Sequence, residues 1–162
     1  MATLRSLRCV IRDKTAHCIE GALAAAAILS HHGHAPHIAC IEARDIDHIV
    51  CLYQRDEKWG SVAHSRDVNL KDRDPIFTTI RDLIMSYYPY YWNMFTGDLN
   101  DLTPRGFTTL DLQQCDRDWV ATEDDLWFIE DELYAARYEA LFPEQDRTHF
   151  LSNRDGTITW IE

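Results

Sequence analysis

The sequence predicts an α+β domain in which one alanine-rich helix packs against an antiparallel sheet. An apolar run at 22–29 lies within a segment of helical spacing. Strand-like segments at 36–44, 48–54 and 59–65 follow it, the last two joined by a polar turn. Additional helical patterns come only after these strands, which is the order of an α+β fold. The 162 residues suit a single domain over 1–162.

The first elements surround the alanine-rich helix. Residues 5–13 are expected to form a short strand or an arm. The helix is predicted over 15–32, with Thr15 as its N-cap and with Gly33 and Pro36 ending it. The strands at 36–44 and 48–54 come next, and the return strand at 59–65 completes a hairpin.

The second half of the chain is predicted to contain two C-terminal helices. A helix is expected over 74–89, because Asp74–Pro75 has the cap-then-proline order of a helix start. Residues 97–120 carry only weak strand and loop signals. Thr122–Asp125 resembles a capping box before an amphipathic helix that is expected to stop at 142–143. A turn and a last strand close the chain, at 155–156 and 157–161.

Composition narrows the class of protein. The formal net charge of −11 repels phosphate backbones, so a nucleic acid is not an expected partner. No apolar run approaches the roughly 18 residues of a membrane span, so no membrane partner is expected either. The first residues lack a hydrophobic signal segment, and five scattered cysteines form no CxxC pair. We therefore expect a cytoplasmic protein with reduced thiols.

Cys18 and His48 are the candidate catalytic residues. Cys18 lies in the first turn of the predicted helix, where backbone N–H groups and the helix dipole favour a thiolate. His48 heads the second strand. A thiol nucleophile needs a base within hydrogen-bond reach, and these residues fill the two roles if the hairpin packs across the helix start. The expected reaction is hydrolysis or transfer at an amide or ester carbonyl, with the Cys18 backbone N–H as one oxyanion donor.

A third group should orient the imidazole of His48. Strand alternation places His48 on the same face as Val50 and Leu52. His64, on the return strand, is the candidate orienter if the hairpin register brings its face round to that of His48. Asp47 and Asp67 are the alternatives.

The order of these features resembles the transglutaminase-like superfamily of papain-type folds. The match covers about residues 8–65 and rests on Cys18 in TAHCIEGALAAAAILSHHGHAP, His48 in DIDHIVCLYQ and Trp59 in KWGSVAH. The resemblance implies a papain/transglutaminase-like arrangement, with a cysteine-bearing helix packed against an antiparallel sheet. It also implies a thiol hydrolase or acyltransferase that needs no cofactor and acts on a peptide or protein amide or ester.

One departure from the family pattern bears on activity. The family's aspartate would fall at Ala63, which cannot orient an imidazole. Either a neighbouring polar residue substitutes for it, or the site is inactive. The alternative interpretation is therefore a catalytically degenerate member of the same fold that acts as a protein-binding module.

Two further groups of residues have a functional interpretation. A substrate cleft is predicted from a histidine beside the nucleophile and from aromatic side chains that would otherwise belong to the core: His17, Trp59, Tyr87, Tyr91 and Trp92. A third class, a metal-binding protein, is raised by the cluster of His31, His32, His34 and His37. This cluster has neither an HExxH nor a cysteine-containing ligand pattern, so no metal site is expected.

Overall fold

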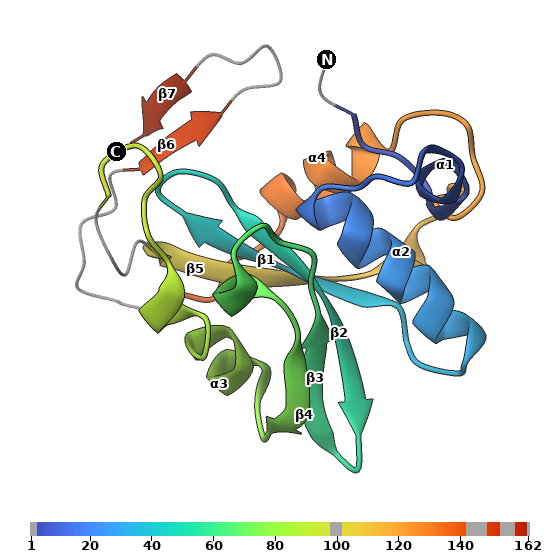
Figure 1. Ribbon diagram of the computed structural model, residues 1–162, viewed down its shortest axis with the longest axis horizontal. Helices are drawn as coiled ribbons and strands as arrows, with labels where there is room; N and C mark the ends of the chain where they lie inside the picture. The colour runs from blue at the N-terminus through green and yellow to red at the C-terminus, as the bar shows by residue number, and fades with distance from the viewer. Residues whose placement is uncertain (1–2, 98–101, 142–148, 153–157, 162) are drawn as a thin grey trace.

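A five-stranded antiparallel sheet forms the centre of the computed structural model, which describes residues 3–97, 102–141, 149–152 and 158–161 (Figure 1). Across the sheet the strands are β4 (Arg73–Phe77), β3 (Lys58–Val62), β2 (His48–Arg55), β1 (His37–Ala43) and β5 (Leu102–Asp111). The described helices are α1 (Leu7–Asp13), α2 (Cys18–His31), α3 (Ile80–Met85) and α4 (Trp127–Ala135). The predicted α+β class and the three strands that follow the alanine-rich helix are confirmed.

The helices cover the two faces of the sheet unequally. α1, α2 and α4 lie on one side, and α3 lies on the other (Figure 1). Side chains of β2 alternate between these layers: Ile49 and Cys51 pack toward α2, whereas Val50 and Leu52 pack toward α3. Each face therefore has its own buried cluster.

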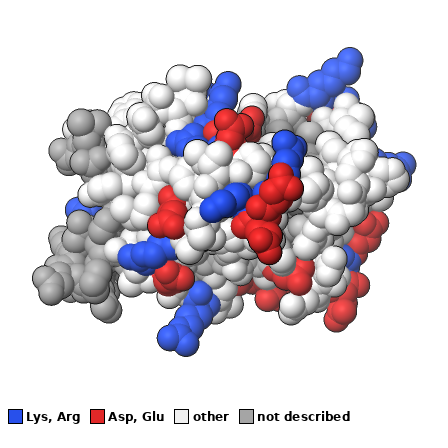
Figure 2. Space-filling model, turned by 90° about the horizontal axis from the view of Figure 1, so that it is seen from below, with Lys and Arg blue, Asp and Glu red and all other residues white. Residues whose placement is uncertain are grey.

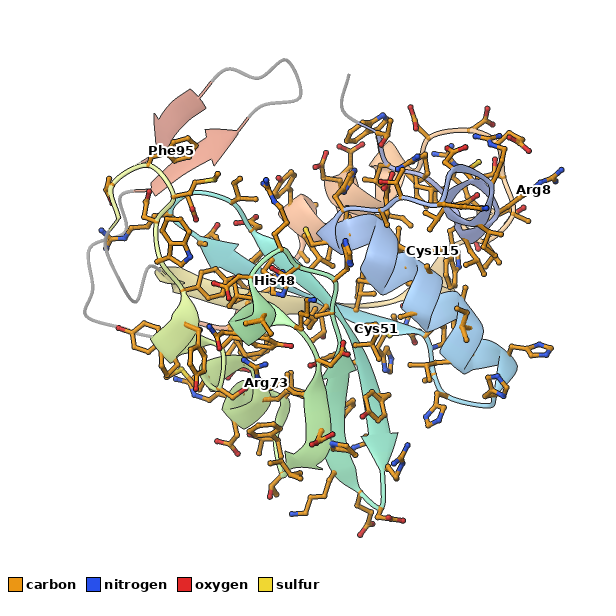
Figure 3. The ribbon with its side chains drawn as sticks, viewed as in Figure 1. Arg8, His48, Cys51, Arg73, Phe95 and Cys115 are labelled. Carbon is orange, nitrogen blue, oxygen red and sulfur yellow. The ribbon has the colours of Figure 1, made fainter. Side chains whose placement is uncertain are left out.

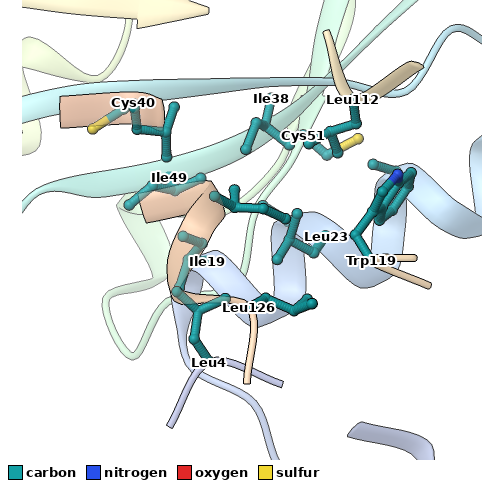
Figure 4. Close-up of a cluster of buried hydrophobic side chains, with 14 of the residues drawn as sticks. Leu4, Ile19, Leu23, Ile38, Cys40, Ile49, Cys51, Leu112, Trp119 and Leu126 are labelled. Atoms are coloured by element: carbon teal, nitrogen blue, oxygen red, sulfur yellow. The ribbon is translucent and has the colours of Figure 1, made fainter. Parts of the chain in front are cut away.

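The cluster on the α2 side is almost entirely apolar. Ile19 and Leu23 lie against Ile38 and Ile49 of the sheet (Figure 4). The small side chains Ala22 and Ala26 belong to the same cluster. The alanines let the helix backbone approach the strands closely, which explains the alanine-rich sequence. Leu4 and Leu126 lie on the side of this cluster away from the sheet, and Trp119 lies at its edge near Leu112 (Figure 4).

The start of α2 differs in detail from the prediction. The helix begins at Cys18 with His17 at the N-cap position, so Thr15 is not the cap. The carboxylate of Glu20 accepts a hydrogen bond of 3.2 Å from the backbone N–H of His17, which stabilises the first turn. The prediction that Cys18 lies in the first turn is confirmed.

The segment at 5–13 was expected to be a strand or an arm, and this expectation is wrong. Residues Leu7–Asp13 form α1, and the Ser6 side chain accepts from the backbone N–H of Cys9 at its N-terminus. The segment is too short for a clear helical period in the sequence, so the capping serine was the better signal.

The helix expected over 74–89 is divided in the structure. Arg73–Phe77 form β4, an edge strand, where Pro75 is tolerated because only one side of the strand needs backbone hydrogen bonds. The helix itself begins at Ile80, where Thr79 is the N-cap and its hydroxyl accepts from the backbone N–H of Asp82 at 3.0 Å. The prediction of a helix here is confirmed, but both of its bounds are wrong, because α3 ends at Met85 and Tyr88–Tyr90 form a separate short helix.

The C-terminal elements are also shifted. α4 is present, but the predicted start at Thr122–Asp125 is wrong: the helix begins at Trp127, and the Thr122 hydroxyl instead accepts from the backbone N–H of Asp124 in a turn. The helix ends at Ala135, because the chain then turns back to the sheet, where Glu139 and Phe107 exchange backbone hydrogen bonds of 3.1 and 2.7 Å. The predicted stop at 142–143 and the turn at 155–156 lie outside the described residues. The predicted last strand is present as β7 (Ile158–Ile161), paired with β6 (His149–Ser152) in a second, two-stranded sheet.

Charged side chains of both signs are mixed on one face of the molecule, and the described helices are not of the membrane-spanning type. Basic side chains lie beside acidic ones over much of the face in Figure 2. Within the described ranges, none of the helices combines the length and the apolar character that crossing a membrane requires.

Candidate active site

A cavity of about 840 Å³ lies at the end of the sheet where β2 begins. The pairing of β3 with β2 stops at Val62 opposite Cys51, so the start of β2 extends past the end of β3. The chain after β3 crosses this end of the sheet near His48 (Figure 3). The cavity brings together most of the residues that the sequence singled out: His17, Cys18, Asp47, His48, His64, Asp67, Tyr91 and Trp92.

Cys18 reaches the cavity as the first residue of α2. Its thiol donates a long hydrogen bond of 3.9 Å to the backbone carbonyl of Asp47, immediately before β2. Burial raises the pKa of the Cys18 thiol, although the backbone N–H groups of Ile49 and Ile19 oppose the rise. The expectation that the helix start lowers this pKa is therefore wrong, because loss of solvation outweighs the backbone dipoles.

His48 is the first residue of β2 and is only 5% exposed. Its Nε2 lies 2.7 Å from the carbonyl oxygen of Leu70, in the short helix η1 (Val68–Leu70). Its ring also packs edge-on against the rings of Tyr87 and Tyr91, at centroid distances of 5.6 and 6.4 Å. Burial lowers the pKa of His48 to about 4, with the nearby Arg73 adding to the effect and the Leu70 bond opposing it.

The tautomer of His48 follows from this hydrogen bond. A carbonyl oxygen can only accept, so Nε2 must carry the hydrogen. With its pKa at about 4, the ring is neutral at pH 7, and its Nδ1 is then an acceptor. In the described part of the chain, the Cys18 thiol and the His48 ring each bond to a backbone carbonyl rather than to one another.

The three candidate orienters occupy other positions around the cavity. The Asp47 carboxylate accepts from the backbone N–H of Ala43 at 3.1 Å and from the Cys40 thiol at 3.7 Å. Asp67 caps η1 by accepting from the backbone N–H of Asn69 at 2.8 Å. His64 is exposed and packs its Cβ against Gly21 of α2. The group that bonds to His48 is instead the carbonyl of Leu70.

Leu70 could not have been selected from the sequence. Its contribution is a main-chain oxygen, which every residue type supplies, so no residue pattern marks it. Ala63, at the position where the resemblance expects an aspartate, donates its backbone N–H to the Asp72 carboxylate at 2.7 Å. That bond fixes the start of the crossing segment, the chain at 63–72 between β3 and β4. This segment places the Leu70 carbonyl next to the ring of His48.

Two predicted cleft residues lie outside this cavity. Tyr87 is fully buried behind His48, and its hydroxyl is hydrogen-bonded to Ser61 Oγ and donates to the Lys71 carbonyl, at 2.7 and 3.0 Å. Trp59 lines a different hollow, beside Thr79 and Arg81. Tyr87 therefore supports the ring of His48 from behind, and Trp59 belongs to another part of the surface.

The other predicted cleft residues line the cavity. His17 is exposed, with its Nε2 2.6 Å from the carbonyl oxygen of Thr3. Trp92 is also exposed, and it lies with the apolar side chains of Ile46 and Met94, which the sequence did not single out. Tyr91 is buried within the wall. The exposed part of the cavity lining thus includes a group of three apolar side chains, Ile46, Trp92 and Met94.

A buried ion pair fixes the helix start that carries Cys18. Glu20 is completely buried, and its carboxylate accepts from Arg5 Nε at 2.8 Å and from Arg5 Nη2 at 2.9 Å. It also accepts from the backbone N–H of Arg5 and from the hydroxyl of Thr3. These bonds attach the N-terminal segment to the first turn of α2.

A metal centre has no counterpart among the residues that the structure describes. No group of three or more histidine, cysteine, aspartate or glutamate side chains there is arranged to hold an ion. His31 and His32 are exposed at the C-terminal end of α2, with their rings 5.6 Å apart.

The fold and the cavity define an α+β protein with a cysteine and a histidine at the end of an antiparallel sheet. No protein-family model matches the chain, and no curated protein matches it.

Proposed function

We propose that the protein is a cysteine-dependent amide or ester hydrolase or acyltransferase, with Cys18 as nucleophile and His48 as base. One observation carries the proposal: both residues line a single cavity, and the tautomer of His48 leaves Nδ1 as an acceptor. A buried, neutral imidazole that lines the same cavity as a thiol at a helix start has the composition of a thiol-based acyl transfer site.

Proton transfer accompanies attack in this mechanism, because both groups are neutral at pH 7. Sγ of Cys18 attacks the carbonyl carbon, its proton passes to Nδ1 of His48, and the carbonyl electron pair moves onto oxygen. The C–N or C–O bond then breaks as the imidazolium returns the proton to the leaving group, which leaves a thioester on Cys18. Water or an acceptor nucleophile attacks this thioester, and His48 again accepts and returns a proton.

The orienting role falls to the Leu70 carbonyl in our proposal. It holds the imidazole in one tautomer, as an aspartate or a histidine does in other triads. The missing aspartate at Ala63 therefore does not by itself argue against activity. The separation of Cys18 and His48 into two backbone hydrogen bonds is compatible with this role, because catalytic hydrogen bonds in unliganded sites often form only with substrate bound.

The remaining parts of the proposal concern fold family, substrate and location. A cysteine at the start of a helix packed on an antiparallel sheet supports a papain-type, transglutaminase-like fold. We propose a peptide or protein amide or ester as substrate, without a nucleic acid or membrane partner. Five free cysteines support a reducing compartment such as the cytoplasm.

The test is acylation of Cys18 by p-nitrophenyl acetate, followed by peptide mass spectrometry. We expect a thioester on Cys18 in the wild type, none in Cys18→Ser, and a rate about 10²–10⁴-fold lower in His48→Ala. Cys115→Ser is the matched control, because Cys115 is also a partly buried free thiol but lies away from the cavity.

Two results would contradict the proposal. If Cys18 is acylated no faster than Cys115, then Cys18 is not an activated nucleophile. If the acylation rate is unchanged in His48→Ala, then His48 is not the base. Either result would favour the non-catalytic, protein-binding alternative.

A further inference from the structure

The hydroxyl of Tyr91 has no hydrogen-bond partner among the described residues. Tyr91 is 3% exposed, and its Oη is buried. Native proteins leave few buried polar atoms unpaired, because such an atom has lost its bonds to water without replacement. Because Tyr91 lines the cavity, its unpaired hydroxyl indicates a bonding partner that arrives with a ligand.

The position of Tyr91 is determined by contacts on several sides. Its ring packs edge-on against the ring of His48, at a centroid distance of 6.4 Å. Its backbone N–H donates to the Tyr88 carbonyl at 3.3 Å. Farther along the same loop, the backbone N–H of Met94 donates to the Asp45 carboxylate at 3.0 Å. Tyr91 is thus held in the cavity wall that it shares with Cys18.

We propose that the Tyr91 hydroxyl is the second oxyanion-hole donor of this site, acting together with the backbone N–H of Cys18. This inference rests on the proposed function. When Sγ of Cys18 attacks, the negative charge develops on the carbonyl oxygen, and Tyr91 donates a hydrogen bond to that oxygen while keeping its own proton. A donor already in place and shielded from water is most effective at this step.

The electrostatic surroundings keep this hydroxyl protonated. Burial raises the pKa of Tyr91 well above its ordinary value, and the nearby carboxylate of Asp47 and thiol of Cys18 raise it further. Tyr91 therefore donates over the whole pH range in which His48 is neutral, and it does not compete with His48 for the thiol proton.

Tyr87 provides a matched control within the same structure. It also packs edge-on against His48, at 5.6 Å, but its hydroxyl is already bonded to Ser61 and to the Lys71 carbonyl. Tyr91→Phe and Tyr87→Phe thus remove the same atom from two neighbours of one histidine. Only the first substitution removes a hydroxyl that has no partner among the described residues, from a residue that lines the cavity.

Two probes separate oxyanion stabilisation from other effects on Cys18. p-Nitrophenyl acetate acylates the thiol through a tetrahedral oxyanion, whereas iodoacetamide alkylates it by direct displacement of iodide, without adding to a carbonyl. We expect Tyr91→Phe to slow acylation of Cys18 by about 10²–10³-fold and to leave its alkylation unchanged. Tyr87→Phe should show no such selective loss.

Each outcome has a distinct meaning. Equal slowing of both reactions in Tyr91→Phe would show that Tyr91 only shapes the site, and no slowing of either would show that it donates nothing. Each of these results overturns the inference while the wild type still acylates. A wild type that is not acylated at Cys18 overturns the proposed function and this inference together. Thermal unfolding of both variants verifies that they fold.

Discussion

The two ends of α2 carry similar residue types in opposite surroundings. At the N-terminal end, Cys18 is enclosed by the N-terminal segment, by the chain that crosses after β3 and by the loop at 91–97. At the C-terminal end, His31 and His32 are exposed to solvent. In the sequence, both ends had a possible function: Cys18 as a nucleophile, and the histidine cluster as metal ligands. What distinguishes them is enclosure, which shifts pKa values and excludes water, and which no local residue pattern specifies.

The first prediction tests what holds the enclosed end together. Glu20→Ala removes the buried carboxylate and leaves Arg5 with Asp13 as its ion-pair partner, and should lower the free energy of unfolding by about 1.5–3 kcal/mol, the range for hydrogen bonds to charged groups. The measurement is urea unfolding followed by tryptophan fluorescence. Glu123→Ala is the matched control, because this glutamate pairs with Arg8 and Arg12 at the surface and should cost far less, as exposed ion pairs do. Equal losses in the two variants would contradict the comparison.

The second prediction uses pH, and concerns the neutral imidazole of the enclosed end. The pKa of His48 is about 4 in the folded protein and 6.5 as the ordinary value, so the unfolded chain binds more protons between these limits. The stability from this group is therefore complete above pH 6.5 and is lost as pH falls toward 4, by about 3 kcal/mol.

His48→Gln removes this titration, so the difference in unfolding free energy between wild type and variant should shrink as pH falls. Urea unfolding between pH 4.5 and 7.5 measures it. A pH-independent difference would mean that His48 is not buried in neutral form.

The third prediction concerns the contact that closes the cavity over α2. A Cβ at Gly21 would lie 2.7 Å from Cβ of His64, so Gly21→Ala must displace the crossing segment. Alanine is favoured over glycine inside a helix by about 1 kcal/mol, but we expect the clash to exceed this gain and to cost about 1–3 kcal/mol. Slower acylation of Cys18 should accompany the loss.

A double variant shows whether the clash is the cause. His64→Gly removes the Cβ that the introduced methyl group would meet, so Gly21→Ala combined with His64→Gly should be more stable than the sum of the single effects predicts. The coupling is read from a double-mutant cycle of unfolding free energies. Additive effects would show that the segment yields without strain.

The smallest effects are expected at the exposed end. His31→Ala and His32→Ala should each change the free energy of unfolding by less than about 0.5 kcal/mol, because the side chains are exposed. Acylation of Cys18 should be unchanged. A large effect on either quantity would show that this end of α2 has a role that its surroundings do not indicate.

The parts of the fold that the sequence predicted are those with a local signal. The alanine-rich helix and the hairpin after it have clear periodicity, and they place Cys18 and His48 at one cavity. β5 was missed because Pro104 and Gly106 interrupt its pattern, and because its position depends on pairing with the distant β1. The edge strand that contains Pro75 was also missed, because it forms by pairing with β3, and no local pattern in the sequence indicates that pairing.

The candidate site, like the fold, could be predicted from the sequence only in part. Residue type suggested a nucleophile and a base, whereas burial decided their protonation, and burial is a property of the assembled layers. The pKa of Cys18 illustrates this, since the helix start and the enclosure act in opposite directions and the enclosure is stronger. Tyr91 was selected as an aromatic lining residue, but its unpaired hydroxyl is visible only in three dimensions.

The bond between His48 and the Leu70 carbonyl has a consequence for mutational scanning. Side-chain replacement at Leu70 leaves the carbonyl in place, so an alanine scan for the proposed activity would detect Cys18 and His48 and overlook this main-chain partner of His48. Only a change to the main chain reaches it. Replacing the amide between Leu70 and Lys71 by an ester would weaken that oxygen as an acceptor, loosening the imidazole while every side chain stays the same.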